Sequence, residues 1–220
     1  MDNGSFTALV TLDISAAYDT IDHSVLSSLQ SDFSIDRKAL AWIQSYFSDR
    51  HSLVQVGRSA ACQQPCIAGV PQGSMLGPLL FTAYISPIGG VVRGFGVNHH
   101  TCADDTQLYV EMADGALDRL SRCISCLQHW FLRNHLLLNG TYGSKSEAII
   151  IGTAQRYAQL LQLSQMSLAG SCATVSESLK LLGMMFDRTM SFDKHVSSVV
   201  CACNFHMSGL WHLDPVSCLR

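Results

Sequence analysis

The sequence contains two strand-like runs joined by a short turn, and this pairing limits the possible folds more than any other feature. The runs are "GFGVNHHTC" at residues 94–102 and "QLYVEM" at residues 107–112, and the residues between them are "ADDT". Because so short a turn returns the chain alongside itself, the two runs predict an antiparallel β-hairpin with Asp104 and Asp105 near its tip. The fold is therefore expected to contain an antiparallel sheet.

The other predicted elements alternate between strands and helices without the regular spacing of βαβ units. A buried strand over residues 6–14 is rich in Val, Leu and Thr and has Asp13 near its end. Asp22 and Asp36 are available as N-caps of two helices, and Ser74 as the cap of a third. We expect an α+β fold, an antiparallel sheet with helices packed on one face. Further strands are expected at residues 51–57, 146–152 and 179–187, and helices at 22–30, 36–49, within 69–86, at 116–134 and at 193–213.

Composition limits the class of protein. Hydrophobic residues make up 48% of the chain and charged residues only 14%, which supplies a large core and argues against disorder. Gly and Pro interrupt the most apolar stretch, "LGPLLFTAYISPIGGVV", so no run is long enough to cross a membrane. The start of the chain lacks the features of a signal peptide, which predicts an intracellular protein. The net charge of −3 counts against a nucleic-acid partner unless basic parts lie outside this sequence.

The nine cysteines are an odd number without a small-domain framework, and we interpret them as reduced thiols. Cys123, Cys126 and His129 have a spacing that suits a metal site. The same spacing lies along one stripe of the predicted helix at 116–134, where cysteine acts as a small core residue. We favour the core because no second pair of the kind found in zinc sites is present. The same reasoning predicts a core role for Cys201, Cys203 and His206.

The adjacent carboxylates of Asp104 and Asp105 allow two interpretations. Asp is a favoured turn residue, and on these letters alone a solvated turn is the better interpretation. The alternative is a cation site, in which a metal relieves the repulsion between the carboxylates. If the strand that contains Asp13 lies beside the hairpin, all three acids meet at one edge of the sheet. Two of them, with phosphate oxygens and water, could then hold a pair of Mg²⁺ or Mn²⁺ ions for an in-line displacement at phosphorus.

Five blocks of the sequence together resemble one known family. They are "LVTLDISAAYDTIDH", "AGVPQGSMLGPLLFTAYI", "CADDTQLYV", "CLQHWFLRNHLLLNG…KSE" and "LKLLGMMFDRTMSFDKHV". Their order and spacing are similar to those of the reverse transcriptases encoded by non-long-terminal-repeat (LINE-type) retrotransposons, and the resemblance covers nearly the whole chain. It implies a polymerase palm that uses Mg²⁺ or Mn²⁺ and dNTPs and acts on an RNA template and a DNA primer, without a membrane.

The resemblance implies roles for the acids and for one aromatic residue. Asp13 and Asp104 match the two metal-binding aspartates of the family, and Asp105 matches the adjacent supporting acid. Tyr18 matches the aromatic residue beneath the incoming sugar, where it would exclude a 2′-hydroxyl by contact. Without the other blocks, Tyr18 would be better interpreted as a core aromatic residue at a junction between a strand and a helix.

Three further residues match positions around the nucleotide. Gln72 and Gly73 correspond to the turn that packs against the nascent base pair, where glycine permits close backbone approach and glutamine offers a donor and an acceptor. Lys145 corresponds to a lysine that protonates or neutralises the departing pyrophosphate. Alone, the first two would be an ordinary turn before a helix, and Lys145 an ordinary solvated lysine. The segment "LLGMMFD" corresponds to the strand pair that positions the primer terminus.

The sequence departs from the family pattern in four places. Cys102 stands where the family has an aromatic residue that packs the hairpin and touches the primer. Lys145 lies six residues after Asn139 rather than about three, which lengthens the loop before it. The chain begins about ten residues before the Asp13 block, without a fingers region, and it ends within the expected thumb. Those regions usually carry the positive charge of the family, which would account for the acidic balance.

The resemblance implies a division of the chain into a palm core at residues 1–152, the end of the palm with primer-positioning strands at 153–196, and the start of a thumb at 197–220. Fingers, thumb and endonuclease regions would belong to a longer polyprotein of the parent element. Three hypotheses follow. The chain is a reverse-transcriptase palm that catalyses nucleotidyl transfer, a catalytically inactive remnant of one, or an unrelated Cys/His metal-binding interaction module.

Overall fold

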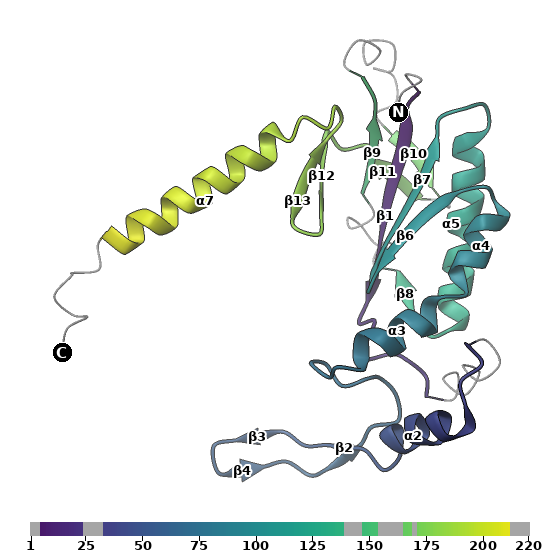
Figure 1. Cartoon of the computed structure of the whole chain (residues 1–220), viewed down its shortest axis with the longest axis vertical. Helices are drawn as coiled ribbons and strands as arrows, with labels where there is room; N and C mark the ends of the chain where they lie inside the picture. The colour runs from purple at the N-terminus through teal and green to yellow at the C-terminus, as the bar shows by residue number, and fades with distance from the viewer. Residues whose placement is uncertain (1–4, 24–32, 139–146, 154–164, 169–170, 212–220) are drawn as a thin grey trace.

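The computed structural model describes residues 5–23, 33–138, 147–153, 165–168 and 171–211. Its centre is a five-stranded antiparallel sheet (Figure 1) in which β1 (Thr7–Ser15) pairs on one side with β7 (Asp105–Glu111). On its other side β1 pairs with β9 (Ala148–Ile151) along its first half and with β8 (Leu137–Leu138) at its end. β6 (Asn98–Cys102) pairs with β7 and forms the edge.

β1 forms because buried aliphatic side chains alternate along it with half-buried ones. Ala8, Val10, Leu12 and Ile14 are buried, and the residues between them are half-buried on the opposite face. Aliphatic and β-branched residues favour a pleated strand with one packed face. Burial of each large aliphatic side chain contributes roughly 1.5–3 kcal/mol. The strand predicted at residues 6–14 is confirmed to within one residue at each end.

Three helices bury their side chains in the same core as this face of the sheet: α3 (Gly77–Ile85), α4 (Ile88–Gly94) and α5 (Ala116–Arg133). α5 contributes a buried stripe at helical spacing, formed by Leu120, Ile124, Leu127 and Phe131. The expected α+β fold, with helices packed on one face of an antiparallel sheet, is confirmed.

Cys123 lies at the edge of the buried stripe of α5 and is fully buried, as predicted. Burial raises the pKa of its thiol to about 11, which makes it an unreactive core residue. Cys126 and His129 are exposed instead, so the prediction that they share the stripe is wrong. At 100° per residue, steps of three residues rotate them progressively away from the core.

A separate arm extends from the foot of the sheet (Figure 1). It begins with α2 (Arg37–Phe47), and its two short strand pairs are β2 (His51–Ser52) with β5 (Gln64–Pro65), and β3 (Gln55–Val56) with β4 (Ser59–Ala60). The single strand predicted at 51–57 is therefore wrong. Two short strands, β2 and β3, take its place, and each pairs with another strand of the arm and not with the central sheet. Asp36 occupies the N-cap position of α2, but its side chain makes no capping hydrogen bond. Most of the helix predicted at 22–30 lies outside the described residues.

β12 (Ser178–Leu181) and β13 (Met184–Asp187) form a hairpin, where the residue pattern predicted one strand at 179–187 and the family resemblance implied a strand pair. Leu182 and Gly183 turn the chain, with left-handed φ angles of 46° and 85°. Leu179 packs on Ile149 and Ile151, so β9 is buried on both faces. The remaining described strands, β10 (Gln165–Leu168) and β11 (Ser171–Thr174), pair with each other.

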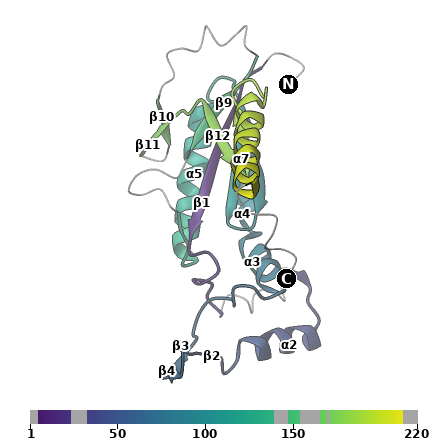
Figure 2. The same cartoon turned by 90° about the vertical axis from the view of Figure 1, so that its left-hand side faces the viewer.

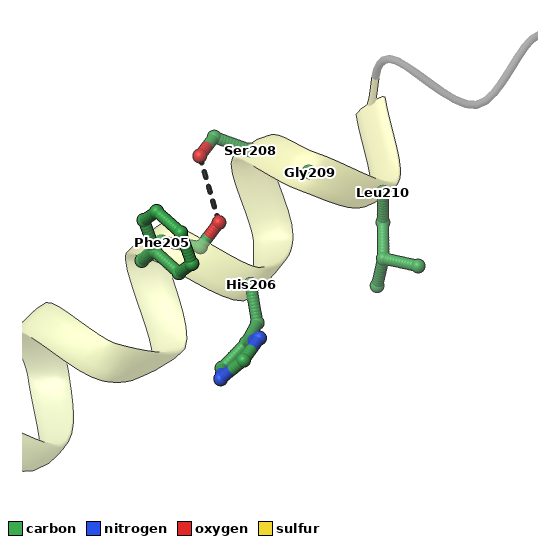
Figure 3. A pocket seen from close by; sticks show the side chains of 5 residues that line it. All are labelled: Phe205, His206, Ser208, Gly209 and Leu210. Atoms are coloured by element: carbon green, nitrogen blue, oxygen red, sulfur yellow. Dashed lines mark hydrogen bonds between the residues drawn. The ribbon is translucent and has the colours of Figure 1, made fainter.

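α7 (Asp193–Trp211) points away from the sheet in Figure 1, and in the turned view of Figure 2 it lies in front of the sheet. Cys201, Cys203 and His206 are exposed, so their predicted core role is wrong: no described element packs against this length of the helix. Figure 3 shows a hollow beside Phe205 that is lined by residues of α7 alone, with the Ser208 hydroxyl donating to the Phe205 carbonyl at 2.8 Å. A single helix encloses no ligand, and this hollow is not a candidate site. None of the helices in the described ranges is both long and apolar enough to span a bilayer.

Asp187 ties the end of β13 to the start of α7. Its buried carboxylate accepts five hydrogen bonds of 2.7–3.0 Å, three from the backbone N–H groups of Thr189, Ser191 and Phe192 and two from the hydroxyls of Thr189 and Ser191. These hydrogen bonds, those from Ser191 foremost, hold the pKa of Asp187 well below its usual range. The carboxylate thus organises the loop from which α7 starts.

We expect Asp187→Asn to lower the free energy of unfolding by about 2–3 kcal/mol, since an amide keeps one acceptor and sets its NH₂ group against backbone donors. The lowered pKa means that this stabilisation is complete above the ordinary value of 3.8 and is lost as the pH falls through the folded value. Urea unfolding at pH 7 and between pH 4 and 2 measures both effects. The exposed Asp193→Asn is the control, and equal losses in the two variants would contradict the prediction.

Candidate active site

The structure brings two of the three predicted acids directly together. In the register of β1 and β7, Asp13 lies opposite Asp105. Opposed residues of antiparallel strands project from the same face, here the face away from the helices. Cys102 on β6 lies opposite Asp105 in turn, so these residues form a row across three strands. The expectation that the Asp13 strand lies beside the hairpin is correct.

Asp104 lies at the tip of this hairpin. Only Ala103 and Asp104 connect β6 to β7, and Asp105 is already the first residue of its strand. Ala103 has a φ of 54°, in the left-handed region that favours glycine, which costs an alanine roughly 1–2 kcal/mol. A two-residue hairpin turn requires a left-handed φ at its first position, which accounts for this conformation. The turn places the Asp104 carboxylate beside the row formed by Cys102, Asp105 and Asp13.

The three carboxylates influence one another electrostatically. Burial raises the pKa of Asp105, and the charges of Asp104 and Asp13 raise it further. A cation would relieve this repulsion. Within the described residues, no three His, Cys, Asp or Glu side chains are grouped so as to hold a metal by themselves. Mg²⁺ commonly binds one or two carboxylates and completes its coordination with water and substrate phosphates, so this donor set fits a site that a bound phosphate completes.

We expect Asp105→Asn to raise the free energy of unfolding of the metal-free protein by about 0.5 kcal/mol at pH 7, the scale of a partly exposed charge pair. The raised pKa of Asp105 means that its carboxyl destabilises the fold once the pH passes through that folded value, so the gain should vanish below pH 3.8. Glu111→Gln, on the same face of β7, is the control. Chemical unfolding at pH 7 and pH 3 measures the effect, and an equal gain for both variants would argue against an acid cluster.

A pocket of about 390 Å³ is lined by Tyr18 and the turn between Pro71 and Pro78. The Tyr18 ring also packs on Phe81, with ring centroids 5.1 Å apart, so it serves both the core and the pocket wall. Burial raises the pKa of Tyr18, and Asp104 and Cys102 raise it further, which places the phenol within electrostatic reach of the hairpin tip. The pocket therefore adjoins the acids.

Gln72 is held by a residue that the sequence analysis missed. Its Nε2 lies 3.2 Å from each carboxylate oxygen of Asp19, which follows Tyr18 directly. Gly73 has a left-handed φ of 80°, a conformation that its predicted role in a turn requires. Leu76 and not Ser74 occupies the N-cap position of α3, so the predicted cap is wrong by two residues, but the Ser74 hydroxyl oxygen accepts a 3.0 Å hydrogen bond from the Gly77 N–H at the start of the helix.

Gly69 joins this turn to the segment after β1. Its N–H donates to the Ile21 carbonyl at 2.8 Å, and His23 Nε2 donates to the Gly69 carbonyl at 2.7 Å. The next residue, Val70, donates to the Tyr18 carbonyl at 2.7 Å. Gly69 has a φ of 84°, and an added Cβ would lie 2.9 Å from the Asp19 backbone oxygen. A glycine directly before Val-Pro-Gln is the sequence signal for this close contact, but the sequence does not indicate that the backbone of Asp19 is the partner of Gly69.

One predicted site residue, Lys145, lies outside the described residues, as does Asn139 before it. The structure therefore places Asp13, Asp104, Asp105, Tyr18, Gln72 and Gly73 around one end of the sheet, and the role of Lys145 stays a prediction.

The sequence model of the family described as "Reverse transcriptase (RNA-dependent DNA polymerase)" matches residues 1–186. Among curated relatives, the RNA-directed DNA polymerase from mobile element jockey of Drosophila melanogaster is 24% identical, over 98% of this chain and 23% of the relative. The probable RNA-directed DNA polymerase from transposon X-element of the same species is 26% identical, over 90% and 21%. The chain thus spans less than a quarter of the length of these relatives.

Solved structures give the same fold. Telomerase from Candida tropicalis in complex with a TWJ fragment of telomeric RNA superposes with a TM-score of 0.58 at 14% identity, over 86% of this chain and 29% of the telomerase. The apo telomerase truncated from its C-terminal domain superposes with a TM-score of 0.56. The resemblance to LINE-type enzymes is confirmed by the jockey and X-element matches. With the family match extending from the first residue to β13, the chain belongs to the reverse transcriptase family.

Proposed function

We propose that this chain carries the nucleotidyl-transfer centre of an RNA-directed DNA polymerase, in which Asp13 and Asp104 bind Mg²⁺ or Mn²⁺ and Asp105 supports them. The observation that carries the proposal is the register of β1 and β7, which opposes Asp13 to Asp105 beside the Asp104 turn. When bound, the divalent ions supply charge stabilisation to the phosphates and activate a hydroxyl nucleophile.

The surrounding side chains have roles that follow from their positions. Tyr18 forms the wall of the pocket beside the hairpin tip, where it would exclude the 2′-hydroxyl of a ribonucleotide. Gln72 lines the pocket, and because its Nε2 donates to Asp19, its carbonyl oxygen remains available to accept a hydrogen bond from a ligand. Cys102 lies in the row with the acids, where the primer terminus would lie. Lys145 would neutralise the departing pyrophosphate.

The partners and the division of the chain belong to the same proposal. The substrates are dNTPs, a DNA primer and an RNA template. Residues 1–152 would form the palm core, 153–196 the primer-positioning part and 197–220 the start of a thumb. Because the chain spans less than a quarter of its curated relatives, fingers, thumb and endonuclease regions of a longer polyprotein are proposed partners in the complete enzyme.

Primer extension on a poly(rA) template with an oligo(dT) primer and dTTP tests the proposal. Extension is expected with Mg²⁺ or Mn²⁺, to stop on addition of EDTA and to resume when the metal is restored. A cooperatively folded protein that extends no primer with either metal would favour the inactive remnant instead. The position of Cys102, a small exposed side chain where the family has an aromatic residue, is the feature that favours that second candidate.

The third hypothesis, a Cys/His metal-binding module, finds no support in the described part of the chain. Cys123 is buried while Cys126 and His129 are exposed, and no group of three potential ligands is assembled there. Metal analysis of the purified protein tests it further, since stoichiometric zinc that survives dialysis would be required.

A further inference from the structure

One side of α2 carries a ladder of cations and aromatic rings that the proposed centre does not use. Lys38, Trp42 and Tyr46 follow one another at four-residue spacing, which aligns them along one side of the helix, and Arg50 lies three residues beyond its end. Lys38 and Trp42 are exposed, with 56% of the Trp42 surface accessible, and Tyr46 and Arg50 are half-buried. These four residues are called the α2 ladder below.

The α2 ladder is ordered by contacts among its own members. The rings of Trp42 and Tyr46 are nearly parallel, with an interplanar angle of 20° and centroids 6.2 Å apart. The Arg50 guanidinium lies over the Tyr46 ring, 5.1 Å from its centroid, and its Nη1 donates to the Tyr46 carbonyl at 3.4 Å. Tyr46 in turn meets the buried Phe47 edge to face. A ligand that stacks on Trp42 would therefore meet a surface that is already organised.

α2 and its two ends carry a small positive charge. The cations are Arg37, Lys38 and Arg50 and the acids are Asp36 and Asp49, which gives a net charge of +1 over residues 36–50. α2 itself contains no acidic residue. This charge favours a polyanion beside α2, within a chain whose net charge is −3.

Contacts at the end of α2 connect the ladder to the pocket turn. Phe47 follows Tyr46 directly and packs on His23, with ring centroids 4.4 Å apart. His23 Nε2 in turn donates to the Gly69 carbonyl, two residues before the turn begins at Pro71. The Tyr46 end of the α2 ladder is therefore connected to the pocket turn through Phe47, His23 and Gly69, and the ladder extends from there along the helix toward Lys38.

We propose that the α2 ladder binds single-stranded RNA, with a base stacked on Trp42 and phosphates bound by Lys38 and Arg50. Exposed aromatic rings beside cations are the combination shared by single-strand binding sites, because every base has a face that stacks and every linkage has a charge. From Lys38 to Tyr46 the helix rises about 12 Å, enough for a few nucleotides. That the bound RNA is the template rests on the proposed function, whereas the binding of RNA to the α2 ladder does not.

Fluorescence anisotropy of a 5′-fluorescein-labelled, unstructured 12-nucleotide RNA tests the proposal in EDTA, where no catalysis occurs. Trp42→Ala is expected to weaken binding at least about fivefold, and Trp42→Phe about twofold or less, because a ring remains. Lys38→Gln is expected to lower the slope of log K against log salt by about 0.7, the value for one phosphate contact on a single strand, while Trp42→Ala leaves the slope unchanged. The controls are Leu132→Ala, an exposed apolar residue of α5, and Arg122→Gln, an exposed cation of the same helix.

The outcomes separate this proposal from the polymerase. RNA affinity that falls in Trp42→Ala but not in Leu132→Ala supports the ladder even if the protein extends no primer. Equal affinities in wild type, Trp42→Ala and Leu132→Ala overturn it. If Trp42→Ala has a lower melting temperature than wild type, the comparison of Lys38→Gln with Arg122→Gln decides, and equal salt slopes overturn the proposal.

Discussion

Primer extension by the Asp104→Asn variant is expected to fall by about 10³-fold or more. In the proposed centre this carboxylate binds a catalytic metal, and the variant replaces it with a neutral amide; the charge stabilisation that such a metal supplies is worth several kcal/mol. At 25 °C, every 1.36 kcal/mol of lost transition-state stabilisation slows the reaction tenfold. Single-turnover extension with saturating dTTP, in Mg²⁺ and separately in Mn²⁺, measures the loss.

The control for Asp104→Asn is Asp114→Asn, which removes an exposed carboxylate before α5. Asp114→Asn should keep wild-type extension, and Asp13→Asn should be as inactive as Asp104→Asn. In metal-free buffer the variants at positions 13 and 104 should melt at a slightly higher temperature than wild type, because each removes one of three neighbouring charges; an equal or lower melting temperature would count against a converged acid cluster. Extension by purified Asp104→Asn at the wild-type rate would exclude the proposed centre.

Gly69→Ala is expected to lower the free energy of unfolding by about 3 kcal/mol. Two effects add at this position. The φ of 84° is left-handed, which costs an alanine roughly 1–2 kcal/mol. Its Cβ would also lie 2.9 Å from the Asp19 backbone oxygen and 3.0 Å from the Asp19 Cα, and neither backbone atom can rotate away. Relief of such overpacking typically costs a further 1–3 kcal/mol.

Gly73→Ala is the matched control for Gly69→Ala. Gly73 has a similar φ of 80°, but a Cβ there would meet no atom of the described residues within 4 Å. Its loss should therefore be limited to the backbone effect of roughly 1–2 kcal/mol. Urea unfolding followed by circular dichroism compares the two variants. If both lose the same amount, the close approach of Gly69 to Asp19 has no energetic consequence and the turn is less firmly joined to β1 than the structure indicates.

The elements that carry the acids could be predicted because their signals are local. Alternating burial in β1 follows from alternating residue types, and the short "ADDT" connection requires a hairpin. Together these place Asp13, Asp104 and Asp105 at one edge without knowledge of any other contact. Which residues face each other across β1 and β7 required the structure, because a shift of the register by two residues would keep the same pattern of buried side chains.

The contacts that fix the pocket could not be predicted because they join segments about fifty residues apart. Asp19 and Gln72, or Gly69 and Ile21, carry no shared sequence signal of their own. The prediction that Cys201 and Cys203 are core residues was wrong for a different reason. Helical spacing of apolar residues shows that one face of a helix can be buried, but it does not show that another element covers that face. Burial depends on the rest of the fold, whereas periodicity depends on the helix alone.

The loop that follows Asp187 connects α7 firmly to the β12–β13 hairpin, so a small rotation of the hairpin moves the whole helix. The β12–β13 hairpin rests on β9 through Leu179, and the carboxylate of Asp187 fixes the loop at residues 189–192, directly before α7, to the end of that hairpin. A helix of 19 residues is about 28 Å long, so a tilt of about 10° at its base moves its far end by roughly 5 Å. A small rotation of the β12–β13 hairpin where Leu179 contacts β9 would therefore produce a larger displacement at the far end of α7.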